Sequence, residues 1–258
     1  MKKRLISAIV ALIILVPLII LGGIPFQVGV FFLSLLGFKE LLNLINKKTK
    51  VPEIINLLSY LSVGLLTLCQ DAIIPCIALI VIFIFIPLIF INKEKYNYDI
   101  ATRLFGSILF TGLIFYSFIY IRLNSIDEFI YLLLISILTD TFAYIGGNLF
   151  GKHKLIPRVS PNKTIEGSII GLLFGTIIPA IYYIFMVDPG VSIISIILIT
   201  ALLSIIGQLG DLVFSSIKRN YDIKDFSNIM PGHGGIMDRV DSISFIIMTY
   251  IIIKAITF

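Results

Sequence analysis

The sequence predicts an all-α protein: a polytopic membrane bundle of about nine transmembrane helices, organised as one domain over residues 1–258. Three observations predict it. The chain is 58% hydrophobic and 14% charged, with a mean hydropathy of +1.07, which is more apolar surface than a soluble core of this size can bury. Apolar runs long enough to cross a bilayer as helices recur along the whole chain. The sequence does not show the short segments of alternating hydrophobicity that are typical of a membrane β-barrel.

The predicted spans follow one another closely along the chain. Their approximate ranges are 5–22, 24–38, 55–70, 72–92, 104–121, 128–147, 168–186, 191–214 and 241–258. The first follows Lys2, Lys3 and Arg4 as a signal peptide would, but no small-residue cleavage site comes after it, so we expect a retained helix. A cytoplasmic N-terminus then places all of the 20 Lys and Arg residues except Arg122 and Lys254 on the cytoplasmic side. We therefore expect a multi-pass protein of the cell's inner membrane.

The two halves of the chain differ in the polar groups that their spans contain. Residues 1–125 carry few ionisable groups within spans, and we expect scaffold helices there. Residues 126–258 carry Asp140 inside the sixth span and Asp211 inside the eighth. A lysine or arginine from a neighbouring helix would satisfy one isolated buried acid. Two acids joined by polar, glycine-rich segments instead favour a site, so we expect the second half to be catalytic.

The first polar segment, residues 146–167, precedes the seventh span. Ser160, Thr164 and Glu166 are typical of a helix start, because hydroxyls cap helices and a carboxylate suits the positive end of the helix dipole. Lys163 does not fit that interpretation, since a cation at a helix N-terminus is unfavourable unless an anion also binds there. A phosphate group is the natural candidate.

The second polar segment runs from the end of the eighth span to the start of the ninth. On a helix, Asp211, Ser215 and Lys218 recur at spacings of four and three and share one face. This pattern stacks an acid, a hydroxyl and a base toward the cytoplasm.

Asp238 and Asp241, three residues apart at the start of the last span, also share a face if the helix has begun there. Two acids in a first helical turn suit the helix dipole, but with Asp211 they also form a plausible oxygen cage for Mg²⁺. Gly234 and Gly235 follow in the same segment as part of a Gly-His-Gly-Gly loop, where backbone N–H groups can approach an anion closely.

The stretch from Ser215 to Asp241, SSIKRNYDIKDFSNIMPGHGGIMDRVD, resembles the signature of the phosphatidate cytidylyltransferases, also called CDP-diacylglycerol synthases. It carries the family's Ser-x-aliphatic-Lys-Arg, Lys-Asp, Pro-Gly-His-Gly-Gly and Asp-Arg-x-Asp elements in order. Met230 stands where the family usually has a branched aliphatic residue or Phe, a departure that affects no polar role. The resemblance extends upstream to residues 140–144, 150–153 and 160–167. It covers the first 125 residues only by hydropathy and topology.

The resemblance implies a nucleotidyltransferase of phospholipid biosynthesis, in which the phosphate of phosphatidic acid attacks the α-phosphorus of CTP and pyrophosphate leaves. The implied partners are CTP, phosphatidic acid and membrane lipids, with no nucleic acid. The implied cofactor is one or two cations, with Mg²⁺ as the first choice. Members of the family are often dimeric, so a homodimer is the implied assembly, with a polar cavity open to the cytoplasm.

The resemblance also implies roles for individual residues. The catalytic set would be Asp211, Asp238, Asp241, Lys218 and Lys163, and the first three of these would bind the metal. The substrate-binding set would be Ser160, Glu166, Ser215, Arg219, Lys224, His233, Gly234, Gly235, Arg239 and Asp140. His233 would either shuttle a proton near neutral pH or only hydrogen-bond its own loop.

Other classes stay open at this point. A cation-coupled transporter would use Asp140 and Asp211 near the midplane, but it needs a site reachable from both faces, and every polar motif lies toward one. A non-enzymatic scaffold leaves the clustered acids and bases without purpose. A CTP-using lipid kinase is a nearer rival, whereas a CDP-alcohol phosphatidyltransferase would need an Asp-Gly-x-x-Ala-Arg segment that the sequence lacks. Cys69 and Cys76 are expected to pack in helices rather than to form a disulfide.

Overall fold

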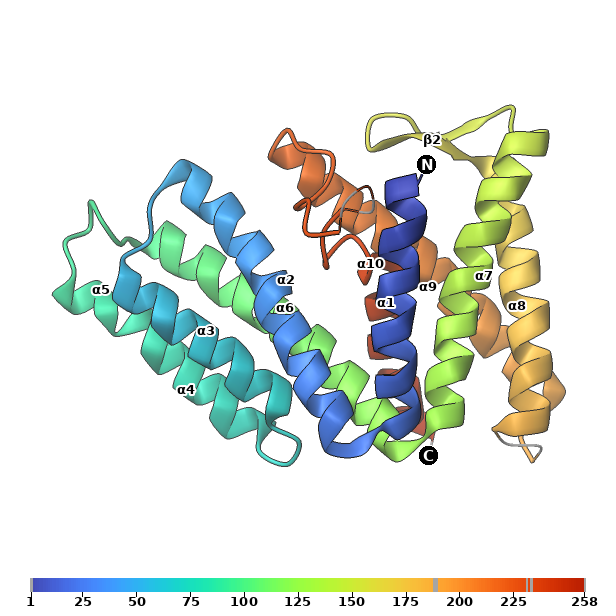
Figure 1. The fold of residues 1–258 in the computed structure, drawn as a ribbon, viewed down its shortest axis with the longest axis horizontal. Helices are drawn as coiled ribbons and strands as arrows, with labels where there is room; N and C mark the ends of the chain where they lie inside the picture. Colours follow the sequence, from blue (N-terminus) through green and yellow to red (C-terminus); the bar gives the residue numbers. More distant parts are fainter. Residues whose placement is uncertain (1, 188–189, 231, 233, 258) are drawn as a thin grey trace. The chain divides into compact units, whose positions relative to one another are not determined.

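The computed structural model describes residues 2–187, 190–230, 232 and 234–257, and most of these residues are helical (Figure 1). The predicted all-α class is therefore confirmed. Every predicted span overlaps a helix. Six helices within the described residues are long and apolar enough to cross a membrane, so the count of about nine is not confirmed. The six are Gly23–Lys47, Ile73–Phe90, Tyr98–Asn124, Ile126–Phe150, Ile165–Met186 and Ile193–Asn220.

Three predicted spans are missing from these six. The first overlaps α1 (Lys2–Leu21), of which Ile9–Leu21 counts only as a shorter apolar helix, and the other two correspond to short helices. Crossing the hydrocarbon core takes about 20 helical residues. The third predicted span is a helix of 16 residues and the last one has 17. Large apolar side chains are nevertheless exposed along the helices, including Phe90, Phe185 and Ile194, as expected of surfaces that face lipid.

By its internal contacts the chain forms two compact units, unit 1 (Met1–Leu123 and Asp225–Met237) and unit 2 (Asn124–Lys224 and Asp238–Phe258). The signature segment therefore contributes to both. The helices of unit 1 are α1 (Lys2–Leu21), α2 (Gly23–Lys48), α3 (Glu53–Leu68), α4 (Ile73–Phe85), α5 (Pro87–Phe90) and α6 (Tyr98–Asn124).

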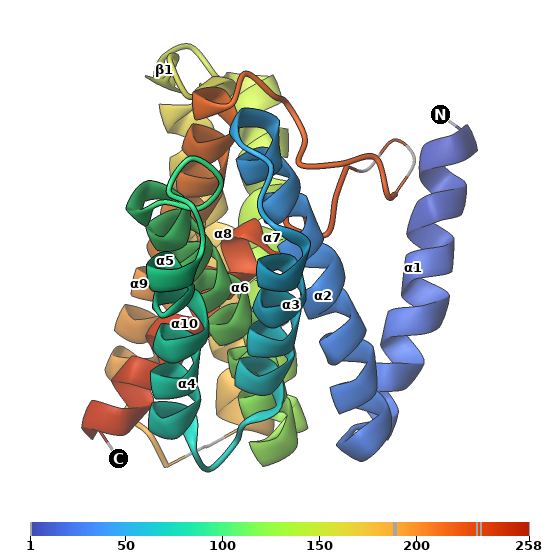
Figure 2. The same cartoon turned by 90° about the vertical axis from the view of Figure 1, so that its left-hand side faces the viewer.

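Unit 1 is built around α2, α3, α4 and α6. Figure 2 shows α3 between α2 and α4, and apolar residues such as Phe38, Ile55, Ile80 and Leu104 form its buried core. Cys69 and Cys76 are free thiols, and Cys69 directly follows the end of α3. This arrangement buries the apolar faces of four helices against one another.

Arg122, near the end of α6, closes the turn between α1 and α2. The Arg122 guanidinium donates hydrogen bonds to the carbonyl oxygens of Ile19, at 2.6 Å, and Ile20, at 3.1 Å. The last carbonyls of a helix have no partner within that helix. Arg122 therefore caps the C-terminus of α1, where a cation also suits the helix dipole.

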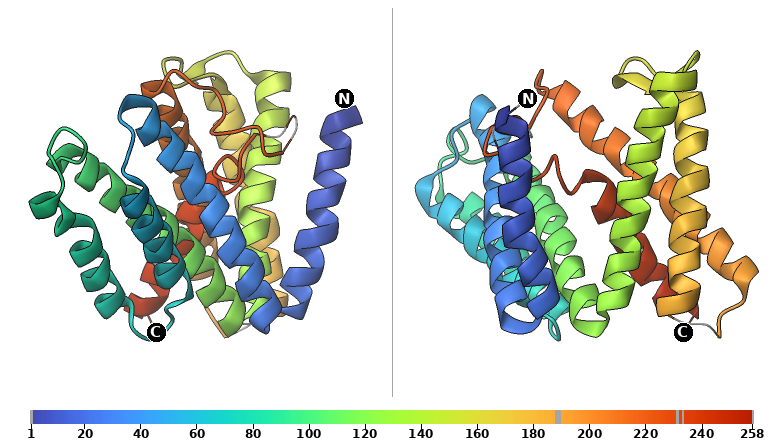
Figure 3. Two further views of the ribbon diagram at one scale, coloured as in Figure 1. Left: turned by 60° about the vertical axis from the view of Figure 1, so that its left-hand side comes forward. Right: turned by 45° about the vertical axis from the view of Figure 1, so that its right-hand side comes forward.

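Unit 2 contains four helices and one small hairpin: α7 (Ile126–Phe150), β1 (Lys154–Ile156), β2 (Ser160–Thr164), α8 (Ile165–Met186), α9 (Ile193–Asn220) and α10 (Asp241–Thr257). The strands pair antiparallel, with Lys154 opposite Thr164. The described residues between α9 and α10 form no regular helix (Figure 3).

Helices α7 and α8 lie side by side at close range (Figure 1). A Cβ at Gly171 of α8 would lie 2.6 Å from the Thr139 carbonyl oxygen, so only glycine allows this approach. The Thr139 hydroxyl also hydrogen-bonds the Ser204 hydroxyl of α9 at 2.8 Å. Thr164 caps α8, because its hydroxyl accepts the Gly167 N–H at 3.2 Å, which confirms the predicted helix start.

Candidate active site

The first polar contact of unit 2 joins the hairpin to α9. The Lys163 ammonium nitrogen lies 2.6 Å from Asp211 Oδ2, and the two side chains are 28% and 24% exposed. On its other oxygen, Asp211 accepts the Ser215 hydroxyl at 3.3 Å, as the shared helical face predicts. A carboxylate of α9 therefore lies beside Lys163, and the phosphate contact predicted for Lys163 stays a prediction.

The second contact joins the end of α9 to the residues just before α10. Lys218 donates to Asp238 Oδ1 at 2.7 Å, and the side chains are 10% and 3% exposed. A charge removed from water in this way is stable only when its partner stays in place, because solvent no longer compensates it. The last turn of α9 is therefore tied to the signature segment.

Two further acids complete the cluster. Asp140 of α7 accepts the Ser242 hydroxyl at 3.4 Å, and Asp241 accepts the Ser242 backbone N–H at 2.9 Å. Asp140 and Asp241 each lie within electrostatic range of Asp211. Like charges this close repel, while Lys163 opposes the repulsion at Asp140 and Lys218 opposes it at Asp241.

We name this group of seven residues the acid–lysine cluster. Its members are Asp140, Lys163, Asp211, Lys218, Asp238, Asp241 and Ser242. Six of them are predicted site residues, brought together from α7, β2, α9, the residues just before α10 and the start of α10. Ser242 was not predicted, because a serine in the first turn of a helix resembles any other capping residue.

The acid–lysine cluster has the right donors for Mg²⁺, since this ion prefers carboxylate oxygens and repelling acids favour a cation between them. Within the described residues, however, no three acid, histidine or cysteine side chains are close enough to hold one ion. Asp211 is held by Lys163 and Asp238 by Lys218. The metal roles of Asp211, Asp238 and Asp241 therefore stay predictions.

Glu166 contacts the turn before the hairpin. Its carboxylate accepts the backbone N–H of Lys152 at 3.1 Å and that of His153 at 3.2 Å, and it lies 2.6 Å from His153 Nδ1. Arg219 acts on the opposite end of the hairpin, donating to the carbonyls of Val159, at 3.3 Å, and Ile223, at 3.0 Å. Both residues shape the loops beside the cluster, and their substrate-binding roles stay predictions.

The remaining predicted residues lie on the surface or in the signature segment. Ser160 begins β2, and Lys224 and Arg239 are exposed. Gly234 and Gly235 are buried in unit 1, and Gly234 has a φ of 84°, a conformation that favours glycine. His233 lies outside the described residues.

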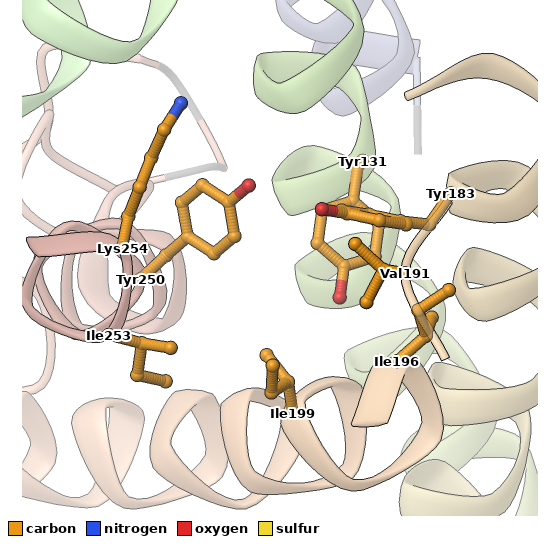
Figure 4. Close-up of a pocket in the computed structure, with 8 residues that line it drawn as sticks. All are labelled: Tyr131, Tyr183, Val191, Ile196, Ile199, Tyr250, Ile253 and Lys254. Atoms are coloured by element: carbon orange, nitrogen blue, oxygen red, sulfur yellow. The ribbon is translucent and has the colours of Figure 1, made fainter. Parts of the chain in front are cut away.

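A cavity also exists in unit 2, about two helical turns from Asp140 along α7 (Figure 4). Its volume of about 20 Å³ is room for roughly one water molecule. It is lined by Tyr131, Tyr183, Val191, Ile196, Ile199, Tyr250, Ile253 and Lys254. Beside it, Lys254 donates to both oxygens of Glu128, at 2.6 and 2.9 Å. This cavity is too small for a nucleotide.

The structure thus combines apolar helices of membrane-spanning length with a cluster of acids and lysines. Residues 2–257 match the Cytidylyltransferase family, and the chain belongs to this family, which makes it a nucleotidyltransferase. It is 40% identical over 251 residues to the phosphatidate cytidylyltransferase of Staphylococcus haemolyticus, covering 96% of each chain. It is also 40% identical to the protein of that name from Staphylococcus epidermidis and 37% identical to that from Staphylococcus aureus, again over 96% of each chain.

Proposed function

We propose that this protein transfers the cytidylyl group of CTP to phosphatidic acid, giving CDP-diacylglycerol and pyrophosphate. A phosphate oxygen of the lipid would bond to the α-phosphorus of CTP, and the bond from that phosphorus to the oxygen bridging to the β-phosphorus would break. The observation that carries the proposal is the acid–lysine cluster, because signature residues of the family build it. The relatives named for this reaction match nearly the whole chain.

The residues of the cluster suit a reaction between two phosphates. Catalysis of such a transfer depends mainly on positioning the reactants and neutralising their negative charge. The Lys163 ammonium is half-buried and bound to one carboxylate, so we propose that it turns to a substrate phosphate. We propose that Lys218 keeps Asp238 in place, and that Arg219, Lys224 and Arg239 attract the triphosphate and the lipid phosphate from the surface.

We propose Mg²⁺ as the cofactor, with Asp211, Asp238 and Asp241 as its ligands. When bound, the ion would supply further charge neutralisation on the nucleotide phosphates. Asp140, which shares the electrostatic environment of Asp211, would add to the negative potential that attracts the ion. Chelation by EDTA should then abolish turnover, and added Mg²⁺ should restore it.

We also propose the location of the reaction, with the N-terminus and the cluster on the cytoplasmic side of the cell membrane and a homodimer as the assembly. The charge distribution supports it, because the predicted cytoplasmic segments carry nearly all lysines and arginines. CTP is a cytoplasmic nucleotide, so a site on that side reaches it directly.

The proposal is tested with the protein purified in detergent and supplied with phosphatidic acid, Mg²⁺ and CTP labelled at the α-phosphorus. A labelled liponucleotide is the expected product, and it should not form without phosphatidic acid. If no labelled lipid appears, the proposed function is wrong.

CTP labelled at the γ-phosphorus separates this reaction from that of a lipid kinase. A kinase would move the γ-phosphate to the lipid, whereas the proposed transfer releases the label in pyrophosphate. A cation-coupled transporter, the other class raised by the sequence, finds no support in the family match.

A further inference from the structure

A buried carboxylate of unit 1, outside the signature, contacts the loop that leads to Asp238. Glu40 of α2 is only 1% exposed. Its Oε1 accepts the Ser227 hydroxyl at 2.6 Å and the Ile236 N–H at 2.8 Å, and its Oε2 accepts the Met237 N–H at 2.9 Å. One side chain thus binds both ends of the segment between residues 227 and 237.

The contact also explains a glycine of the signature. A Cβ at Gly235 would collide with the carboxylate of Glu40, so any other residue there would push the acid or the loop aside. Gly235 is itself buried, as are Ile236 and Met237. The close approach of Glu40 is therefore enough to explain why this position is a glycine.

The two amides that Glu40 binds lie directly before a residue of the acid–lysine cluster. Ile236 and Met237 come directly before Asp238, the partner of Lys218 in the buried pair. Since peptide units are planar, holding two successive N–H groups orients two peptide planes and restricts how the chain enters the next residue. Hydrogen bonds to a carboxylate are roughly twice as strong as those between neutral groups, which suits this task.

From these contacts we propose that Glu40 is a positioning residue for the reaction, which holds Ser227, Ile236 and Met237 in place and thereby sets the placement of Asp238. The proposal rests on the proposed function, and it extends the catalytic machinery into the half of the chain that the sequence predicts to be scaffold. Glu40 would act through the loop and would touch neither substrate.

Two substitutions at Glu40 give a graded test, because the two carboxylate oxygens carry different bonds. Glu40→Gln keeps one oxygen to accept from Ser227 and Ile236, but it presents an NH₂ group to the Met237 N–H. Glu40→Ala removes all three acceptors. We expect kcat to fall by about 10-fold in the first and about 100-fold in the second, because small misplacements of catalytic groups cost rates of that order.

Ser227→Ala is a milder variant that removes one bond and leaves the Glu40 carboxylate intact. We expect a fall of a few-fold in kcat, smaller than that of Glu40→Gln. This variant and Glu40→Gln keep the proposal testable if Glu40→Ala fails to fold.

Ser34→Ala is the matched control on the same helix. Ser34 is fully buried, but its hydroxyl bonds the Phe31 carbonyl of its own helix at 2.7 Å. Glu128→Gln is a second control, since it removes the charge of a buried acid that contacts Lys254 instead of the loop. Both should keep the kcat of the wild-type protein, whatever they do to its melting temperature.

Hydrogen exchange in the absence of substrates gives an independent readout. The amides of Ile236 and Met237 should exchange faster in both Glu40 variants than in the wild type. Their exchange rates should be unchanged in the two controls. If the wild-type protein makes no liponucleotide, the proposed function fails, while the exchange data still report whether Glu40 holds the loop.

The decisive comparison uses temperatures at which every variant is folded. A lower melting temperature with an unchanged kcat would mean that Glu40 only stabilises the fold, and the proposal would be wrong. Unchanged exchange at residues 236 and 237 in Glu40→Ala would also overturn it.

Discussion

The two lysine–aspartate pairs of the acid–lysine cluster have nearly the same geometry and very different surroundings. The Lys163–Asp211 pair is 2.6 Å long with side chains 28% and 24% exposed, and the Lys218–Asp238 pair is 2.7 Å long with side chains 10% and 3% exposed. Water compensates the charges of the first pair in part, and those of the second hardly at all. The first pair can therefore change partners at small cost, whereas the second must stay intact.

Under the proposed function, the two pairs would have different tasks in one reaction. Lys163 and Asp211 can release each other at small cost, which suits residues that exchange a resting partner for a phosphate or a cation. Lys218 fixes the end of α9 to the signature segment, and it would stay paired with Asp238 while Asp238 binds the proposed ion. The predictions below separate stability from turnover on this basis.

The largest effect is expected from Asp238→Asn, which leaves the Lys218 cation buried without its carboxylate. Breaking a buried pair costs about 3–5 kcal/mol of stability, so both the melting temperature in detergent and the turnover should fall steeply. Thermal denaturation and the liponucleotide assay measure the two quantities. Replacing both members together, as Lys218→Met with Asp238→Leu, should recover stability but no activity. If Asp238→Asn melts like the wild type, the pair does not have the structural importance that its burial suggests.

Asp211→Asn should give a large effect on turnover alone. The pair with Lys163 is partly open to water, and solvent-exposed pairs contribute about 1 kcal/mol or less to stability. Turnover should nevertheless fall by about 100-fold or more, as expected for loss of a group that stabilises charge in the transition state. The liponucleotide assay at saturating CTP and Mg²⁺ measures this fall. Wild-type turnover in the variant would contradict a metal role for Asp211.

Lys163→Met should have an intermediate effect. It removes a cation from the substrate phosphates but leaves the acids able to bind Mg²⁺, so we expect a fall of roughly 10- to 100-fold in turnover. The same variant frees Asp211 from its resting partner, and half-maximal activation should therefore need less Mg²⁺. Titration of activity with Mg²⁺ checks both effects, and an increased Mg²⁺ requirement would argue against exchange of partners at Asp211.

The smallest effect is expected from Cys69→Ala. Cys69 is a free thiol of unit 1, packed against its apolar core and remote in sequence from every cluster residue. Both the turnover and its response to oxidants should match the wild type. A large loss of activity would reveal a role for this half of the chain that neither packing nor Glu40 explains.

Much of the acid–lysine cluster was predictable because several of its residues lie only a few positions apart in the sequence. The four-residue interval between Asp211 and Ser215 places both on one helical face, and their hydrogen bond follows. The capping of α8 by Thr164 follows equally from local sequence. The ion-pair partner of each lysine was less predictable, since the sequence around Lys163 is compatible with either a phosphate or a carboxylate as its partner.

Glu40 shows where sequence reasoning stops. It stands in Phe38-Lys39-Glu40, a charged stretch in the predicted scaffold half, and nothing local separates it from a solvated acid. Its three donors follow it by 187, 196 and 197 positions in the chain. Contacts of such separation depend on how helices pack, which no periodicity in one segment encodes.

The sequence by itself determined the helical membrane class, the family signature and the local order of acids and bases, because hydropathy, helical period and motif spacing act over a few residues. Only the tertiary structure decided which lysine pairs with which aspartate, how much water reaches each pair, and that a carboxylate of α2 holds the loop before Asp238. The physical reason is that ion-pair partners and burial are properties of surfaces brought together by folding, and those surfaces come from distant parts of the chain.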